Sequence, residues 1–155
     1  MSKKDKEGAI EEIGPDDDWE VLFPGEFLRG VDIDGHRPTV KIARLYRKTV
    51  RGKKHPVAEL EGKDRKWKIN FTNGLCMATM FGPKAKKWVG KRVTLCAEMV
   101  TAFGKTKPAI RVYGSPEIDK EIEVYKDLGD FAPIRRTLKP TKRNGGPSTS
   151  RSKAP

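Results

Sequence analysis

The chain has 155 residues, of which 35% are hydrophobic and 35% are charged, and its formal net charge is +12. This length suits one domain with a modest core and extensions at its ends. A basic excess of this size indicates a polyanionic partner such as nucleic acid; the alternative is a surface charged only for solubility.

The sequence disfavours membrane insertion, secretion and zinc binding. No apolar run is long enough to cross a bilayer, and the first residues lack the apolar core of a secretory signal. Cys76 and Cys96 do not form a metal-binding pair, and the spacing of His36 and His55 is not that of metal ligands. We therefore expect a cytoplasmic protein with free thiols, no bound metal and no cofactor.

A polar leader is predicted over residues 1–25. It begins with lysines and then turns acidic, and its few apolar residues show no clear period, so we expect it to be flexible. An acidic leader beside a basic domain can compete weakly for the ligand site. The alternative is a leader that is merely solvated.

The domain is predicted to span residues 26–114, and its first long strand to begin after Pro38. Apolar residues alternate at the start of this strand, but Leu45 falls out of phase. A bulge near Ala43 and Arg44 restores the alternation and lets the strand bend around a small barrel.

Two shorter strands follow. The second is predicted over residues 56–62, after a basic turn. In the third, Trp67, Ile69 and Phe71 alternate with polar residues and are predicted to form its apolar face.

A helix is predicted next, over residues 74–81. Thr72 or Asn73 can cap its N-terminus, and Gly82 followed by Pro83 should end it.

Two further strands are predicted, over residues 92–97 and 109–114. Trp67 and Trp88 are assigned to the core. The resulting order is three strands, one helix and two strands. This is the order of the OB-fold, a five-stranded barrel that commonly binds oligonucleotides, so we predict a mainly β, OB-fold-like barrel.

The chain resembles a family of small phage and prophage proteins in four motifs. These are the string INFTN, the helix ending in MFG, the corner W.GK and the strand IRV. The resemblance covers about residues 23–114. The matching positions are Ile69, Thr72, Asn73, Met77, Met80, Phe81, Gly82, Trp88, Gly90, Lys91, Leu95, Ile110, Arg111 and Val112. It implies an OB-like protein of the single-stranded DNA-binding type that acts in phage DNA replication or recombination, and it supplies no catalytic residues.

The C-terminal part is predicted to leave the barrel. Ser115, Pro116 and Glu117 are typical of a helix start, and an apolar stripe follows, so a short helix packed on the domain is expected over residues 115–130. A partner-binding helix is the alternative. Residues 131–155 are rich in basic residues, Gly, Pro and Ser, which predicts a disordered basic tail.

Charge is segregated along the chain. Residues 39–113 hold 19 Lys or Arg against four acids, while acids gather in the leader and in residues 117–130. A surface that is charged only for solubility would interleave both signs. The segregation therefore favours a basic ligand-binding face on the domain.

The candidate site combines cations with aromatic rings on the strand 2–3 face and on the two turns that flank it in OB-folds. It comprises Arg44, Tyr46, Arg51, Lys53, Lys54, Lys66, Lys68, Phe103, Lys105, Lys107, Arg111 and Tyr113. Lysines can follow phosphates, while aromatic faces can stack on bases of any sequence. The alternatives are that Phe103 packs within its own loop and that Tyr46 and Tyr113 pack at sheet edges.

No nucleophile–base set, P-loop or carboxylate cluster for magnesium is recognisable in the domain, so we expect a binding protein rather than an enzyme. The leading hypothesis is sequence-tolerant binding of single-stranded DNA, with replication or recombination proteins as possible partners. The alternatives are a protein-interaction module that inhibits or recruits a host nucleic-acid enzyme, and RNA binding.

Overall fold

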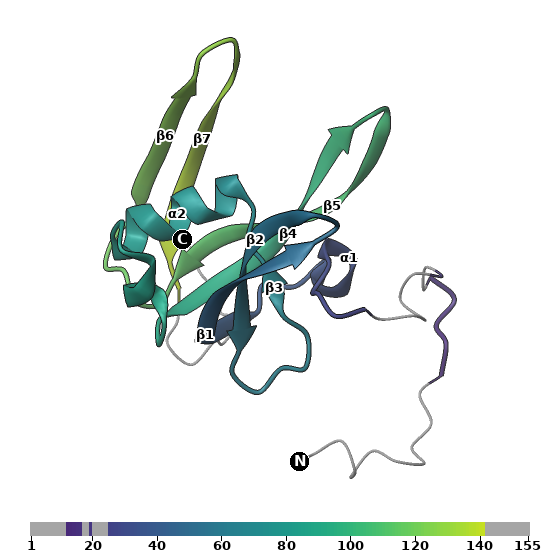
Figure 1. The fold of residues 1–155 in the computed structure, drawn as a ribbon. Helices are drawn as coiled ribbons and strands as arrows, with labels where there is room; N and C mark the ends of the chain where they lie inside the picture. The colour runs from purple at the N-terminus through teal and green to yellow at the C-terminus, as the bar shows by residue number, and fades with distance from the viewer. Residues whose placement is uncertain (1–11, 17–18, 20–24, 142–155) are drawn as a thin grey trace.

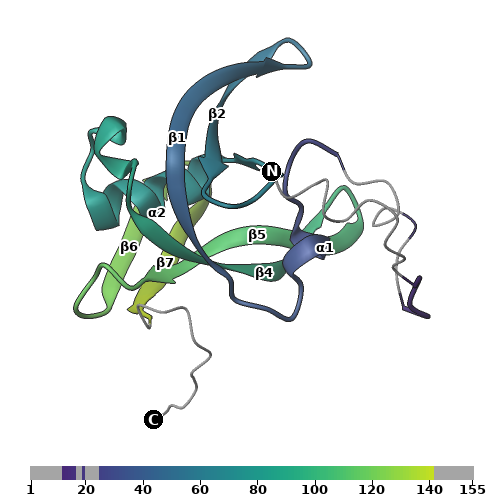
Figure 2. The same cartoon turned by 90° about the horizontal axis from the view of Figure 1, so that it is seen from below.

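The computed structural model describes residues 12–16, 19 and 25–141, so most of the predicted leader and residues 142–155 lie outside the described part. The fold is mainly β, with one open seven-stranded sheet in the order β3-β2-β1-β4-β5-β7-β6 (Figures 1 and 2). The elements are α1 (Gly30–Ile33), β1 (Thr39–Val50), β2 (Lys53–Leu60), β3 (Trp67–Lys68), α2 (Phe71–Phe81), the 3-10 helix η3 (Ala85–Trp88), β4 (Arg92–Ala102), β5 (Lys105–Ser115), β6 (Ile122–Leu128) and β7 (Phe131–Pro140).

The predicted bulge in β1 is confirmed. The register of β1 against β2 shifts between Ile42 and Arg44, so Ala43 has no partner there. Ile42 is fully buried before the shift, and Leu45 packs against the core after it. One extra residue thus keeps both apolar side chains on the core face of a strand that bends along its length.

The junction between β3 and α2 differs from the prediction. The helix begins at Phe71, and Asn70 is its N-cap, accepting a hydrogen bond from the backbone N–H of Asn73 at 2.9 Å. Phe71 is therefore not on the strand's apolar face, and it is 64% exposed. Asn70 displaces the predicted caps because its extended backbone and short acceptor side chain suit this position.

The core assignments of Trp67 and Trp88 are confirmed. Trp67 is fully buried, and Trp88 is 8% exposed with its indole N–H donating to the carbonyl of Gly82 at 2.9 Å. Gly82 ends α2, as predicted. The indole thus ties η3 back to the end of the helix while its ring fills the core.

Asn73 joins α2 to the edge of β5. Its amide donates to the carbonyl of Ile110 at 2.9 Å and accepts from the N–H of Val112 at 3.2 Å. One carboxamide therefore satisfies two backbone groups that a neighbouring strand would otherwise pair. Within the described ranges β3 does not pair with β5, so the predicted five-stranded barrel does not close, and its strands belong to an open seven-stranded sheet.

The prediction of a helix over residues 115–130 and a disordered tail from 131 is wrong for the described part. Residues 122–140 form the β6–β7 hairpin, which projects from the domain in Figure 1. Val124 and Leu138 are buried in the core, and β7 pairs in parallel with β5 at Gly114 and Ser115. The domain therefore extends past residue 114, because its core needs apolar side chains from this hairpin.

Candidate nucleic-acid interface

Four of the predicted site residues share one face of β1–β3. Tyr46 pairs with Val57, and Val57 pairs with Lys68, so their side chains form a row across three strands. The neighbouring row of Leu45, Ala58 and Trp67 faces the core. The first row therefore lies on the opposite, outer face, where Lys68 is exposed, Tyr46 is half-buried and the central Val57 is fully buried.

The same alternation adds more residues to this outer face. Arg44 lies two residues before Tyr46 and pairs with Glu59 of β2, and Lys66 lies two residues before Lys68. Without the bulge, Arg44 and Tyr46 would lie on the face of Val40 and Ile42. The bulge is thus the local feature that brings them to the basic face.

Two aromatic rings on the outer face each have a cationic side chain close to them. The Arg44 guanidinium lies 4.7 Å from the centroid of the Tyr46 ring, and it also forms an ion pair with Glu59 at 3.3 Å. The Lys68 ammonium lies 5.6 Å from the centroid of the Phe27 ring. A base can stack on an aromatic ring or on a guanidinium plane, so each pair offers a stacking surface beside a positive charge.

Sequence reasoning missed Phe27 and Lys48. Phe27 forms an isolated parallel bridge with Lys66, which places its half-buried ring beside β3. Lys48 follows Tyr46 on the same face and forms an ion pair with Glu26. A hydrogen bond from Lys48 lowers the pKa of the Glu26 carboxyl, and the same bond raises the pKa of Lys48. The segment that contains Glu26 and Phe27 therefore lies along one side of the candidate site.

Two basic turns lie at the ends of the long hairpins. In the β1–β2 turn, Arg51 has φ 52° and is followed by Gly52 and by Lys53 and Lys54, all of them exposed. In the β4–β5 turn, Phe103 has φ 53° and precedes Gly104, with Lys105 and Lys107 exposed on β5. Both turns lie on the right-hand side of Figures 1 and 2 and are separate from one another.

The Phe103 side chain does not pack against the rest of the described fold. Its relative exposure is 102%, so the alternative of a loop-packing residue is wrong for the described part of the chain. A bulky residue at positive φ is uncommon because its Cβ crowds the backbone. The backbone strain and the exposure are what a residue kept for contact with a partner would show.

Arg111 and Tyr113 do not join the Tyr46 row. Both are half-buried on β5, where Arg111 pairs with Cys96 and donates a side-chain hydrogen bond to the carbonyl of Ile110 at 3.0 Å. The guanidinium of Arg37 lies 4.2 Å from the centroid of the Tyr113 ring and donates to its hydroxyl at 3.1 Å. These two side chains therefore already have partners within the fold.

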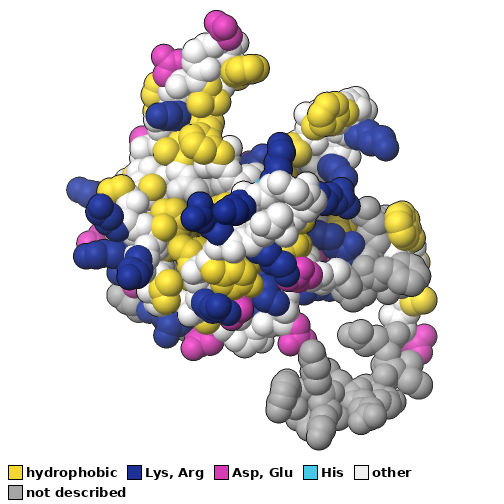
Figure 3. Space-filling model, in the orientation of Figure 1, with side chains coloured by type: hydrophobic (Ala, Val, Ile, Leu, Met, Phe, Trp, Pro, Cys, Tyr) yellow, Lys and Arg dark blue, Asp and Glu magenta, His cyan; other side chains and the backbone are white. Residues whose placement is uncertain are grey.

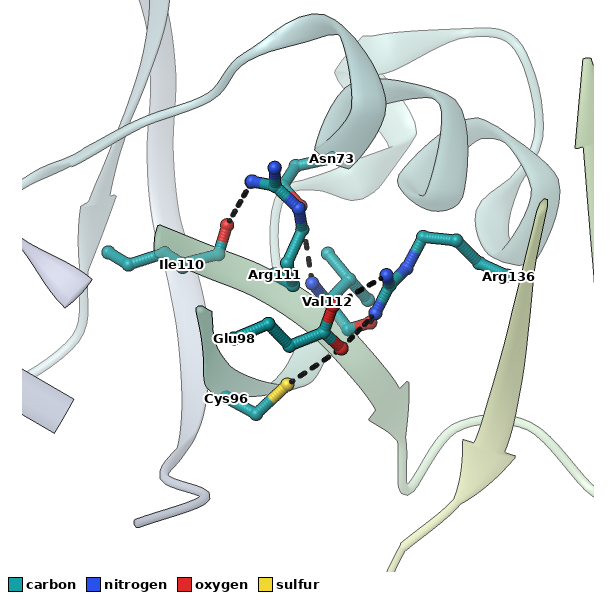
Figure 4. A network of polar contacts seen from close by, with 7 residues as sticks. All are labelled: Asn73, Cys96, Glu98, Ile110, Arg111, Val112 and Arg136. Atoms are coloured by element: carbon teal, nitrogen blue, oxygen red, sulfur yellow. Dashed lines mark hydrogen bonds and ion pairs between the residues drawn. The ribbon is translucent and has the colours of Figure 1, made fainter. Parts of the chain in front are cut away.

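Arg111 lies beside a polar network that joins β4, β5 and β7 (Figure 4). Arg136 of β7 donates two hydrogen bonds to Glu98 of β4, and the Cys96 thiol lies 3.8 Å from the same carboxylate. Burial and the neighbouring Glu98 raise the pKa of Cys96 to about 11. Burial likewise raises the pKa of Cys76, so neither thiol is activated as a nucleophile.

Figure 3 shows Lys and Arg side chains spread over the β1–β2 and β4–β5 hairpins, with hydrophobic side chains between them. Among residues 12–16, 19 and 25–141, no group of three or more His, Cys, Asp or Glu side chains could hold a metal ion. Within these same ranges, no helix has the length and apolar character that a membrane span needs. Comparison with protein-family models, curated proteins and solved structures finds no match.

Proposed function

We propose that the protein binds single-stranded nucleic acid, DNA in the first place, without sequence preference and without catalysis. The observation that carries the proposal is the outer face of β1–β3. There the Arg44 guanidinium lies over the Tyr46 ring and the Lys68 ammonium over the Phe27 ring, with Lys66 in a backbone bridge to Phe27. Cationic side chains along a protein surface can bind successive phosphates of a nucleic-acid strand, and aromatic rings between them can stack on bases of any sequence.

The topology supports the same proposal. The strands β3-β2-β1-β4-β5 lie in the order of an OB-fold, and α2 stands between β3 and β4 in the chain. In that fold the strand 2–3 face and the two flanking turns hold the ligand. The basic turns at Arg51 and Phe103 join the corresponding pairs of strands, β1 with β2 and β4 with β5, and would extend the contact. The resemblance to small phage proteins adds the proposal that the binding serves replication or recombination in a host cytoplasm.

A protein-interaction module is the second candidate. It is favoured by the exposed side chains of the β6–β7 hairpin, where Tyr125 is 55% exposed and Phe131 is 77% exposed. Exposed aromatic side chains are common in protein interfaces. RNA binding uses the same chemistry as DNA binding, so it is an outcome of the test below.

The test is a binding competition among single-stranded DNA, duplex DNA and RNA of equal length at fixed salt, followed by a salt titration. We expect single-stranded DNA to bind best, with about four to seven phosphates engaged and a log–log salt slope of about −0.7 for each. A flat salt dependence, or no binding to any nucleic acid, would instead support the protein-interaction candidate.

A variant pair locates the site. Lys68→Gln should reduce the salt slope by about 0.7, because it removes one phosphate contact. Lys63→Gln is the matched control, since Lys63 is exposed in the turn between β2 and β3 and has no ion pair with a described carboxylate. Equal effects of the two substitutions would show that charge acts generally and that the outer face is not the site.

A further inference from the structure

A second group of cations lies on η3, away from the two basic turns. Lys84, Lys86 and Lys87 are exposed within four residues of chain, and none forms an ion pair with a carboxylate in the described ranges. The sequence from residue 65 to residue 97 contains no Asp or Glu. These lysines, here called the η3 lysines, are therefore free to bind an anion from outside the chain.

The backbone that carries the η3 lysines is held in place. Trp88 is buried, and its indole is hydrogen-bonded to the carbonyl of Gly82. The N–H of Lys87 donates to the carbonyl of Lys84 at 2.9 Å, and the N–H of Gly90 donates to the carbonyl of Ile42 at 2.7 Å. The turn is thus attached both to α2 and to β1. It presents its three ammonium groups from a fixed base rather than from a free loop.

The position of η3 separates these lysines from the basic turns. Both Figure 1 and Figure 2 place the segment between α2 and β4 at the left of the domain, and the β1–β2 and β4–β5 turns at the right. Figure 3 shows Lys or Arg side chains gathered at that left end as well. Trp88, which ends η3, packs in the core with Ala58 and Trp67, on the side of the sheet opposite the outer face. One strand bound on the outer face of β1–β3 and at the right-hand turns would therefore leave the η3 lysines uncovered.

We propose that the η3 lysines bind the phosphate backbone of a second nucleic-acid strand, so that one protein molecule bridges two strands. This inference rests on the proposed function, because it requires the first strand to occupy the outer face. Bridging follows from charge: a protein with two separate cationic surfaces lowers the repulsion between two polyanions. The added activity is the juxtaposition of strands, which is the first step in annealing complementary sequences.

The test uses two oligo-dT strands of about 12 nucleotides, a length within the site size of one OB-fold module. One strand carries a donor dye and the other an acceptor, so that energy transfer reports bridging without base pairing. Binding of a single labelled strand is measured in parallel, and light scattering with size-exclusion chromatography confirms that the protein is monomeric. We expect energy transfer with the unmodified protein.

The variant K84Q/K86Q/K87Q should lose most of the energy transfer, while its affinity for one strand should fall by no more than about threefold. The control K63Q/K120Q/K126Q removes the same charge from three exposed lysines elsewhere and should keep the energy transfer. Equal thermal stability of both variants would show that neither effect is due to unfolding.

The inference is overturned if the unmodified protein binds single strands but shows no energy transfer, or if the η3 variant bridges as well as the control. It is also overturned if the η3 variant loses single-strand affinity as strongly as Lys68→Gln, since η3 would then be part of the first site. An absence of single-strand binding in every protein would refute the proposed function itself, which is a separate result.

Discussion

Arg136 of β7 reaches across β5 to hold Glu98 of β4. Its two terminal nitrogens donate to the two carboxylate oxygens at 2.9 and 2.7 Å, and one of them also lies 3.3 Å from the carbonyl of Val112. Bidentate pairs of this kind are among the stronger charge-assisted hydrogen bonds. The β6–β7 hairpin is thereby fixed to the sheet by side chains as well as by its short backbone pairing with β5.

This pair predicts a loss of stability in acid. The hydrogen bonds from Arg136 lower the pKa of Glu98 below its ordinary value. A carboxyl with a lowered pKa in the folded state contributes stability above its unfolded pKa of about 4.3, and this contribution disappears as the pH falls through the folded value. Glu98→Gln should therefore lower the melting temperature at neutral pH and flatten its decline between neutral pH and acid.

Glu61→Gln is the matched control for this experiment, because Glu61 is exposed and has no ion pair with a described cation. The control should keep the acid dependence of the unmodified protein. If Glu98→Gln behaves like the control at every pH, the ion pair contributes nothing measurable and the hairpin is held by packing alone.

The contact of Asn73 with β5 predicts a sensitive position on α2. Asn73→Ala leaves the carbonyl of Ile110 and the N–H of Val112 without their partner, and Asn73 is 2% exposed. The free energy of unfolding should fall by about 1–3 kcal/mol. Asn73→Asp can accept from Val112 but cannot donate to Ile110 when ionised, so it should also destabilise. Urea denaturation measures both, and an unchanged midpoint for Asn73→Asp would contradict the role of the donated bond.

Gly114 predicts a steric effect where the hairpin joins the sheet. A Cβ at this position would lie 1.8 Å from the carbonyl oxygen of Lys139, so Gly114→Ala must push β7 away from β5. We expect a loss of about 1–3 kcal/mol or more and faster hydrogen exchange in β6 and β7. Gly74→Ala is the contrasting variant. Its Cβ would meet only Ile69 at 3.8 Å, and Ala favours the helix by up to about 1 kcal/mol.

Features encoded within one segment could be predicted from the sequence. The out-of-phase Leu45 indicated the bulge, and the period of two placed Arg44 with Tyr46 and Lys66 with Lys68 on common faces. Phe27 could not be placed in this way. Its position depends on a bridge to Lys66, about 40 residues further along the chain, which no local period signals.

The hairpin could not be predicted for a related reason. Ser115 does form the local hydrogen bond expected of a residue that caps a helix: its hydroxyl accepts from the N–H of Glu117 at 2.9 Å. The same hydroxyl donates to the carbonyl of Arg92 at 2.6 Å, so it forms a turn against β4 instead of a helix. The strands β6 and β7 are stabilised by the burial of Val124 and Leu138 and by the hydrogen bond from Arg136 to Glu98. All of these are contacts with distant parts of the chain.

The positive φ of Phe103 leads to a prediction in which stability and binding change in opposite directions. The ring is fully exposed and the backbone is left-handed at φ 53°. Replacing it with Gly removes a backbone penalty of about 1–2 kcal/mol, so Phe103→Gly should raise the free energy of unfolding, less a smaller loss from the flexibility of Gly in the unfolded chain. If the ring stacks on a base, the same change should weaken binding of single-stranded DNA by about 1–3 kcal/mol.

Two further variants at this position separate stacking from other effects. Phe103→Ala keeps the positive φ unfavourable, so it should weaken binding by the same amount with little change in melting temperature. Phe103→Trp should retain binding and give indole fluorescence that an oligonucleotide quenches. Melting temperature and affinity are measured on the same preparations. Unchanged affinity in both Phe103→Gly and Phe103→Ala would remove the ring from the interface and leave Tyr46 and Phe27 as the stacking residues.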